Sequence, residues 1–460
     1  MKNQVHKPQV ALIGRANVGK STLFNRLVED QKSLVSAIAG TTRDRNESDC
    51  LWRGQIISLV DTGGLDVDRS DEIESSIEVQ ARKALKNADA ILFVVDVQSG
   101  LQSEDHDIAK ELIALKKPVI VVANKADNAE LRASLNEKEW HTWSFKEIHP
   151  VSARQGTGAG DLLDVLYKAL EDVNVPPVDI QDVTSVRVSV IGRPNVGKSS
   201  LLNKLLGEER FIAADKDHTT REPSDTMITV DGQNYTLIDT AGIRKLAKVR
   251  AGKSKLEQGG VDRSLRSARR SDVVLLVLDI TKRIHTQDKF LGGELEKAGV
   301  SVIIVANKWD KIPDKGTNTI NDYEAYIRAH MPMLSWAPIV FTSAITGKRV
   351  QGIFDTIDKV FRNRFTQLSR NEARDFIRQA IVKHKPSRGK GVAHPKILYF
   401  EQAHVNPPTF YLGIKQGRVD VLHQSYLKFL INILRRFYEF EGTPIRISIK
   451  ARKKKHTTYG

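Results

Sequence analysis

Two eight-residue segments, residues 14–21 and 192–199, have the composition of a phosphate-binding loop. They read Gly-Arg-Ala-Asn-Val-Gly-Lys-Ser and Gly-Arg-Pro-Asn-Val-Gly-Lys-Ser. In such a loop the backbone N–H groups surround phosphates, the lysine reaches the β- and γ-phosphates, and the serine ligates Mg²⁺. The sequence therefore predicts two nucleoside triphosphate sites, each with Mg²⁺. The predicted contacts are Gly14, Asn17, Val18, Gly19, Lys20, Ser21 and Thr22 in the first site and Gly192, Asn195, Val196, Gly197, Lys198, Ser199 and Ser200 in the second.

A second pair of motifs predicts which base is bound. Each copy has an Asn-Lys-x-Asp segment after an apolar run, and a Ser-Ala pair further on. A carboxylate can accept hydrogen bonds from N1–H and from the exocyclic amine of guanine, whereas N1 of adenine is itself an acceptor. We therefore expect both sites to select guanine. The residues concerned are Asn124, Lys125, Asp127, Ser152 and Ala153 in the first copy and Asn307, Lys308, Asp310, Ser343 and Ala344 in the second.

The paired motifs belong to an internal duplication. An offset of 178 residues aligns the two phosphate loops, two Thr-Thr-Arg segments (41–43 and 219–221) and two Asp-Thr-x-Gly segments (61–64 and 239–242). The offset grows to 183 at the Asn-Lys-x-Asp motifs and to 191 at the Ser-Ala pairs. A repeat this long is a duplicated domain, because solenoid repeats are much shorter.

The motifs lie between strand-like apolar runs and helical patterns, which alternate along the chain. In the first copy, apolar runs at residues 10–13, 56–60, 90–95 and 119–123 alternate with helical patterns at 21–27, 73–85 and 105–115. Such alternation predicts an α/β fold, a doubly wound, mostly parallel sheet with its ligand at the carboxyl ends of the strands. We expect a first domain at residues 1–170, a linker with two prolines at 171–185, a second domain at 186–366 and a small α/β domain at 367–460.

The basic charge of the chain is concentrated at its C-terminal end. Residues 345–460 contain 24 Lys and Arg against 8 Asp and Glu, whereas the preceding residues contain 47 against 48. Such a segment is either a solvated face or a nucleic-acid-binding surface, and we favour nucleic acid. No apolar run has the length of a membrane helix, and a single cysteine, Cys50, cannot form an intramolecular disulfide. We expect a cytoplasmic protein that acts as a monomer and has no membrane partner.

Taken together, the motifs resemble one family, the bacterial tandem-domain ribosome-assembly GTPases known as Der or EngA. The resemblance covers the whole chain and includes both phosphate loops, the Thr-Thr-Arg segments and residues 440–447, which are similar to the last strand of that family's KH-like domain. It implies GTP hydrolysis and binding of the large ribosomal subunit, or its precursor, through ribosomal RNA. It also assigns roles at the catalytic centres, where Lys20 and Lys198 act with Thr42 and Thr220 (Mg²⁺ ligands), Asp61 and Asp239 (Mg²⁺ through water) and Gly64 and Gly242 (contact to the γ-phosphate).

The position that orients the attacking water in Ras-like enzymes is apolar in both copies. Leu65 and Ile243 stand there and cannot form a hydrogen bond, so we expect slow intrinsic turnover. In related GTPases with this substitution an asparagine of the phosphate loop ligates K⁺. Asn17 and Asn195 would do so here, or they merely satisfy the loop backbone.

Two further segments are candidates for RNA contact. Residues 244–270, after the second Asp-Thr-x-Gly motif, hold ten basic residues and are either a solvated loop or a nucleotide-sensitive RNA contact. In the C-terminal domain we expect helices at 371–383 and 426–440 and strands at 396–402, 409–415 and 445–450. The G-x-x-G loop of ordinary KH domains is not evident, and residues 385–391 are the nearest basic stretch. We expect Phe429, Phe437 and Phe440 to lie in the core.

Two functions remain open at this point. One is a switch that licenses maturation of the large ribosomal subunit. The other is a GTP-dependent partner in RNA binding or RNA modification away from the ribosome, whose hydrolysis a particular small RNA would stimulate.

Overall fold

The structure is a computed structural model. It describes residues 7–29, 47–62, 84–136, 140, 143, 145, 148–180, 184–207, 225–240, 255–386, 395–415 and 422–451. The chain divides into two compact units, Met1–Val183 with Gln367–Asp375 and Thr184–Thr366 with Phe376–Gly460. None of the described helices is both long and apolar enough to cross a membrane.

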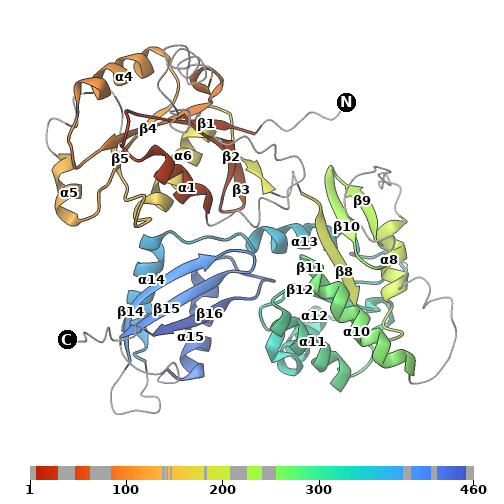
Figure 1. Ribbon diagram of the computed structural model, residues 1–460. Coiled ribbons are helices and arrows are strands. Elements are labelled where there is room, and N and C mark those ends of the chain that lie inside the picture. The colour runs from red at the N-terminus through yellow and green to blue at the C-terminus, as the bar shows by residue number, and fades with distance from the viewer. Residues whose placement is uncertain are drawn as a thin grey trace. The chain divides into compact units, whose positions relative to one another are not determined.

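The first unit is built on a mostly parallel sheet with strand order β2-β3-β1-β4-β5-β6. The β2–β3 pair and the β3–β7 pair are antiparallel. Helices α1 and α6 lie on one face of the sheet and α4 on the other, each over its own apolar cluster (Figure 1). The strands are β1 (Gln9–Ile13), β2 (Glu47–Trp52), β3 (Gln55–Asp61), β4 (Ala90–Asp96), β5 (Val119–Asn124), β6 (Ile148–Pro150) and β7 (Val178–Asp179), and the helices are α1 (Lys20–Glu29), α4 (Ser103–Ala114), α5 (Ala129–Ala133), the 3₁₀ turn η2 (Ser134–Asn136) and α6 (Ala159–Asp172).

The second unit repeats this sheet in the order β9-β10-β8-β11-β12-β13. Only the β9–β10 pair is antiparallel. Helices α10, α11 and α12 pack on one apolar face, and Phe354 of α13 packs against Tyr235 of β10. The elements are β8 (Val186–Ile191), α8 (Lys198–Leu206), β9 (Thr226–Val230), β10 (Gln233–Leu237), α10 (Lys255–Arg269), β11 (Val273–Asp279), α11 (Thr286–Ala298), β12 (Ser301–Asn307), η4 (Trp309–Lys311), α12 (Thr319–His330), η5 (Pro332–Leu334), β13 (Ile339–Phe341) and α13 (Gly352–Asn363).

A three-stranded sheet of order β14-β15-β16 follows in the C-terminal segment. Its first pair is antiparallel and its second parallel. The elements are α14 (Arg370–Lys383), β14 (Lys396–His404), β15 (Thr409–Lys415), α15 (Gln424–Phe437) and β16 (Arg446–Ala451).

The predicted fold class is confirmed, and most predicted elements lie within a few residues of the observed ones. The pattern at residues 73–85 falls almost wholly outside the described residues. One strand was missed: within the expected linker, β7 pairs with β3 at the edge of the first sheet. Helix α15 ends at Phe437, three residues before the predicted end, and Phe437 is 57% exposed, so the prediction of a core position for it was wrong. Phe440, in contrast, is 1% exposed.

The small sheet is attached to the sheet of the second unit through a buried arginine. Arg364, directly after α13, is 5% exposed. Its guanidinium donates to Ser301 Oγ at 2.7 Å and to Asn406 Oδ1 at 2.5 Å. The Val302 amide of β12 donates to the Gly442 carbonyl at 2.9 Å. Burial lowers the pKa of Arg364 to about 10, so the group remains charged at neutral pH. The start of β12 and the loop before β16 are thereby held together.

Candidate guanine-nucleotide site

Both phosphate loops connect a strand to a helix at the carboxyl edge of a parallel sheet. The first follows β1 and leads into α1, and the second joins β8 to α8. Gly19 has φ +94° and Gly197 φ +103°, a backbone conformation that side chains disfavour. A Cβ at Gly19 would overlap the Asn124 amide, and one at Gly197 would overlap that of Asn307. These glycines therefore allow the loop to touch the next motif.

The two loop lysines lie along their own loops. Lys20 Nζ donates to the carbonyls of Gly14 (2.7 Å) and Arg15 (3.0 Å). Lys198 Nζ donates to the equivalent carbonyls of the second loop at 2.8 and 2.7 Å. Burial lowers the pKa of Lys198 to about 8. Each ammonium group is thus held at the rim of the loop where a phosphate would meet it.

The asparagine of each Asn-Lys-x-Asp motif joins three loops. Asn124 Nδ2 donates to the Val18 carbonyl at 2.9 Å, and its Oδ1 accepts from the Ala153 amide at 3.1 Å. Asn307 repeats the arrangement with Val196 at 2.9 Å and Ala344 at 3.0 Å. The predicted contacts to phosphate and to base are therefore brought together in both copies, with the asparagine as the positioning group.

The lysine of this motif pairs with an aspartate that the sequence analysis did not identify. Lys125 Nζ lies 2.6 Å from Asp96 Oδ2, at the end of β4, and Lys308 lies 2.6 Å from Asp279, at the end of β11. Burial works to raise the pKa of Asp279, but the hydrogen bonds from Lys308 and Thr281 outweigh it and hold that pKa below its ordinary value. The ion pair fixes the lysine stem beside the base-recognition segment.

Asp127, the predicted guanine-recognition group, is already oriented. Its Oδ1 accepts a hydrogen bond from Ser152 Oγ at 2.6 Å, so the Ser-Ala pair supports the carboxylate as well as the loop. Asp310, in the second copy, is exposed. An exposed or hydrogen-bonded carboxylate at this place can accept both N–H donors of guanine.

Another unpredicted pair anchors the second residue of each phosphate loop. Arg15 Nε lies 3.1 Å from Asp105 Oδ2, and Arg193 Nε lies 2.7 Å from Asp288 Oδ2. Both aspartates are almost completely buried and cap the first turn of α4 or α11. Asp105 and Asp288 are related by the offset of 183 residues that also aligns the Asn-Lys-x-Asp motifs. This shared offset could have identified both aspartates from the sequence.

The two predicted Mg²⁺-binding aspartates differ in conformation. Asp61 is the last residue of β3 and is 4% exposed. Asp239 lies past the end of β10 with φ +56°. Its Oδ2 accepts from Ser267 Oγ at 3.4 Å and lies 3.9 Å from Arg263 Nε, both on α10. The carboxylate of the second copy is thus drawn toward the helix that follows its switch segment.

Several predicted residues lie outside the described residues. They are Thr42, Gly64, Leu65, Thr220, Gly242 and Ile243, most of the basic stretch 385–391, and residues 244–254 of the basic segment after the second switch. Their assigned roles stay predictions. The rest of that basic segment, except Arg270, forms α10.

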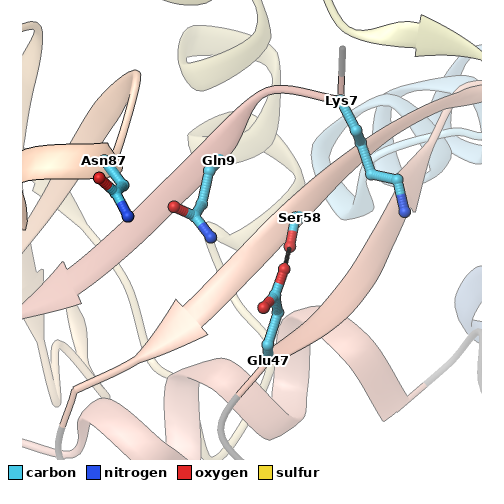
Figure 2. Close-up of a pocket in the computed structure, with 5 residues that line it drawn as sticks. All are labelled: Lys7, Gln9, Glu47, Ser58 and Asn87. Carbon is cyan, nitrogen blue, oxygen red and sulfur yellow. Dashed lines mark hydrogen bonds between the residues drawn. The ribbon is translucent and has the colours of Figure 1, made fainter. Parts of the chain in front are cut away.

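A pocket of about 390 Å³ lies at the opposite end of β1 from the first phosphate loop. Figure 2 shows its lining residues, which are Lys7, Gln9, Glu47, Ser58 and Asn87. Glu47 accepts a hydrogen bond from Ser58 Oγ at 2.6 Å. None of the predicted nucleotide-binding residues lines this pocket, so it is separate from the guanine-nucleotide site.

Comparison with known proteins agrees with this geometry. The profile described as "50S ribosome-binding GTPase" matches residues 9–125 and 187–308, and the one described as "KH-domain-like of EngA bacterial GTPase enzymes, C-terminal" matches residues 367–450. GTPase Der of Pelotomaculum thermopropionicum is 40% identical over 97% of this chain and 99% of its own length. GTPase Der of Lactobacillus johnsonii is 42% identical over the same shares of the two chains.

The chain belongs to the GTPase Der family. It is a GTP-hydrolysing enzyme that binds guanine nucleotides, with two P-loop GTPase domains and a KH-like C-terminal domain. The phosphate-loop residues described above lie within the two matched GTPase domains, and the roles assigned to individual site residues remain predictions.

Base selection by the first centre is tested in a Lys198→Ala background, where only the first site should bind tightly. Asp127→Asn should shift the ratio of GTP to XTP affinity by about 10- to 100-fold toward xanthine, whose exocyclic oxygen can accept from the new amide. Competition with a fluorescent GTP analogue measures the ratio. Asp310→Asn in the same background is the matched control and should leave the ratio unchanged. An unaltered ratio in the Asp127 variant would contradict the role of that carboxylate.

The pH dependence of the second centre follows from Lys198. With a pKa of about 8, the free lysine loses its proton as pH rises through 8, while only the charged form attracts phosphate. In a Lys20→Ala background, GTP affinity should therefore fall about three- to fourfold from about pH 7 to about pH 8.5. Lys198→Arg, which stays charged, should remove this pH dependence even if it binds more weakly. A flat profile in the parent lysine form would show that the group does not titrate in this range.

Proposed function

We propose that the chain acts as a GTP-dependent switch in assembly of the large ribosomal subunit, binding ribosomal RNA of that subunit or of its precursor in the cytoplasm. The observation that carries the proposal is the combination of two GTPase domains, whose matching family is described as 50S ribosome-binding, with a KH-like domain that is strongly basic. A basic surface binds RNA phosphates largely through release of counterions.

Mg²⁺ fits the residues that are present. Among the described residues no cluster of three or more His, Cys, Asp or Glu side chains could hold a metal. Mg²⁺ in nucleotide sites instead takes one or two protein oxygens, with waters and substrate phosphates completing its octahedron. Ser21 and Ser199 would ligate the ion, Asp61 and Asp239 would hold it through water, and Thr42 and Thr220 would join in the GTP state. Loss of the γ-phosphate would release Thr42 and Thr220 from the ion, and this release would be the switch.

A monovalent cation would supply positive charge next to the phosphates at the transition state. Asn17 (φ +63°) and Asn195 (φ +64°) are exposed residues at the middle of the phosphate loops. A K⁺ ion held by these side chains would lie near the β- and γ-phosphates and would stabilise the charge that develops there. Intrinsic turnover would remain slow, because Leu65 and Ile243 cannot orient water.

The switch is tested by sedimentation with purified large-subunit particles. A nonhydrolysable GTP analogue should increase binding by about tenfold or more relative to GDP, since a ligand shifts a switch only through differential affinity. Lys20→Ala and Lys198→Ala, which disable one pocket each, show which centre controls the response. Equal binding with both nucleotides would contradict the assembly switch. Hydrolysis stimulated by a small RNA, and not by particles, would instead favour a function away from the ribosome.

The cation role is tested by replacing K⁺ with Na⁺ at constant ionic strength. GTP turnover should fall by about tenfold or more if the cation acts as a preorganised charge. Asn17→Ala and Asn195→Ala should each remove the sensitivity of their own domain, measured with the other pocket disabled. Equal rates in both salts would leave the asparagines with a structural role only.

A further inference from the structure

One face of the C-terminal sheet carries side chains that the nucleotide sites do not use. The register of β14, β15 and β16 separates two faces. The inner face is apolar, and Phe400 lies 5.0 Å from Phe410 and 5.3 Å from Phe376 of α14, measured between ring centroids. The outer face, which we call the platform, consists of Lys396, Tyr399, Glu401 and His404 on β14, Thr409, Tyr411, Gly413 and Lys415 on β15, and Arg446, Ser448 and Lys450 on β16.

Tyr399 lies flat on this platform. Its cross-strand partner is Gly413, and a Cβ at Gly413 would overlap three atoms of the tyrosine ring. The ring therefore covers the glycine backbone, yet Tyr399 is still 42% exposed. One face of the ring is against the sheet, which leaves the other for a planar partner.

A second tyrosine and a lysine stand beside it. Tyr411 pairs with Glu401 and is a diagonal neighbour of Tyr399, a relation that places the two side chains about 7–8 Å apart. Lys450, which pairs with Gly413, holds its Nζ 4.3 Å from the centroid of the Tyr411 ring. A cation thus lies against the second aromatic ring.

The charge of the platform is strongly positive. Lys396, Lys415, Arg446 and Lys450 are exposed, and Glu401 is the acidic side chain among the platform residues. Covering a glycine in a sheet would explain the position of one aromatic ring. It would not explain a second tyrosine on the next strand or three lysines on the same face. Arg446 is held in another way, since it donates to the Ala298 carbonyl at 3.2 Å.

We propose that this platform binds single-stranded RNA, with one base stacked on Tyr399, the next on Tyr411, and Lys450 turned from the Tyr411 ring to the phosphate between them. Open sheets that bind single strands commonly use aromatic side chains in this way. The inference rests on the proposed function, in which RNA is the partner. It differs from the sequence analysis, which named residues 385–391 as the basic stretch nearest to the RNA-binding loop of ordinary KH domains, because it places the RNA contact on the open sheet.

The test uses the full chain, with a GTP analogue bound, and a fluorescein-labelled single-stranded RNA dodecamer of mixed sequence. Tyr399→Ala should weaken binding about 5- to 100-fold, the range for loss of one stacked base. Tyr399→Phe keeps the ring and should bind within about twofold of the parent. Phe437→Ala removes an even more exposed ring from α15 and should have no effect. Equal affinity of Tyr399→Ala and the parent would overturn the platform.

Lys450 is tested by salt dependence. Lys450→Gln should lower the slope of log affinity against log salt by about 0.7, the value for one phosphate of a single strand. Lys428→Gln removes an exposed lysine from α15 and is the matched control. An unchanged slope in the Lys450 variant would place the phosphate elsewhere.

Crosslinking keeps the proposal testable if a variant folds poorly. The parent chain with 4-thiouridine in the RNA should crosslink to peptides of β14 or β15. Crosslinks confined to α15 or to residues 385–391 would overturn the proposal. So would a parent chain that does not bind the dodecamer.

Sedimentation with large-subunit particles distinguishes failure of the platform from failure of the proposed assembly switch. If Tyr399→Ala binds RNA as well as the parent while sedimentation still depends on GTP, the platform alone is overturned. If Tyr399→Ala weakens RNA binding but sedimentation is the same with GTP analogue and GDP, the assembly switch alone is overturned.

Discussion

One side-chain amide in each GTPase domain holds the nucleotide site together. Asn124 and Asn307 donate to the phosphate loop and accept from the Ser-Ala loop, with distances that agree within 0.1 Å between the copies. The glycine before each loop lysine must lack a side chain because this amide occupies the adjacent space. Phosphate binding and base recognition thus depend on one buried group, which explains why the motifs lie at a common edge of the sheet.

The contacts within motifs could be predicted from sequence, whereas those between motifs could not. The loops, the Asn-Lys-x-Asp segments and most elements follow from local spacing and apolar periodicity. The pairs Arg15–Asp105 and Lys125–Asp96 join residues 90 and 29 positions apart, and nothing local marks those aspartates. Only the duplication does, because Asp288 and Asp279 recur at one offset. Strand β7 was missed because it is two residues long and follows two prolines.

The duplicated domains differ at the aspartate that is predicted to hold Mg²⁺ through water. Asp61 continues its strand, whereas Asp239 has turned out of its strand toward Ser267 and Arg263. A partly exposed ion pair at 3.9 Å contributes little stability, so Asp239 is held only weakly against α10.

Attachment of the KH-like domain limits how a nucleotide signal can reach RNA. The domain is bonded to the first residues of β12, while Asn307 at the other end of β12 holds the nucleotide loops. The strand between them is buried along its whole length, and close-packed strands of this kind do not bend readily. The second GTPase domain and the C-terminal sheet should therefore move as one body. A nucleotide-dependent change in the proposed RNA affinity would then arise outside β12.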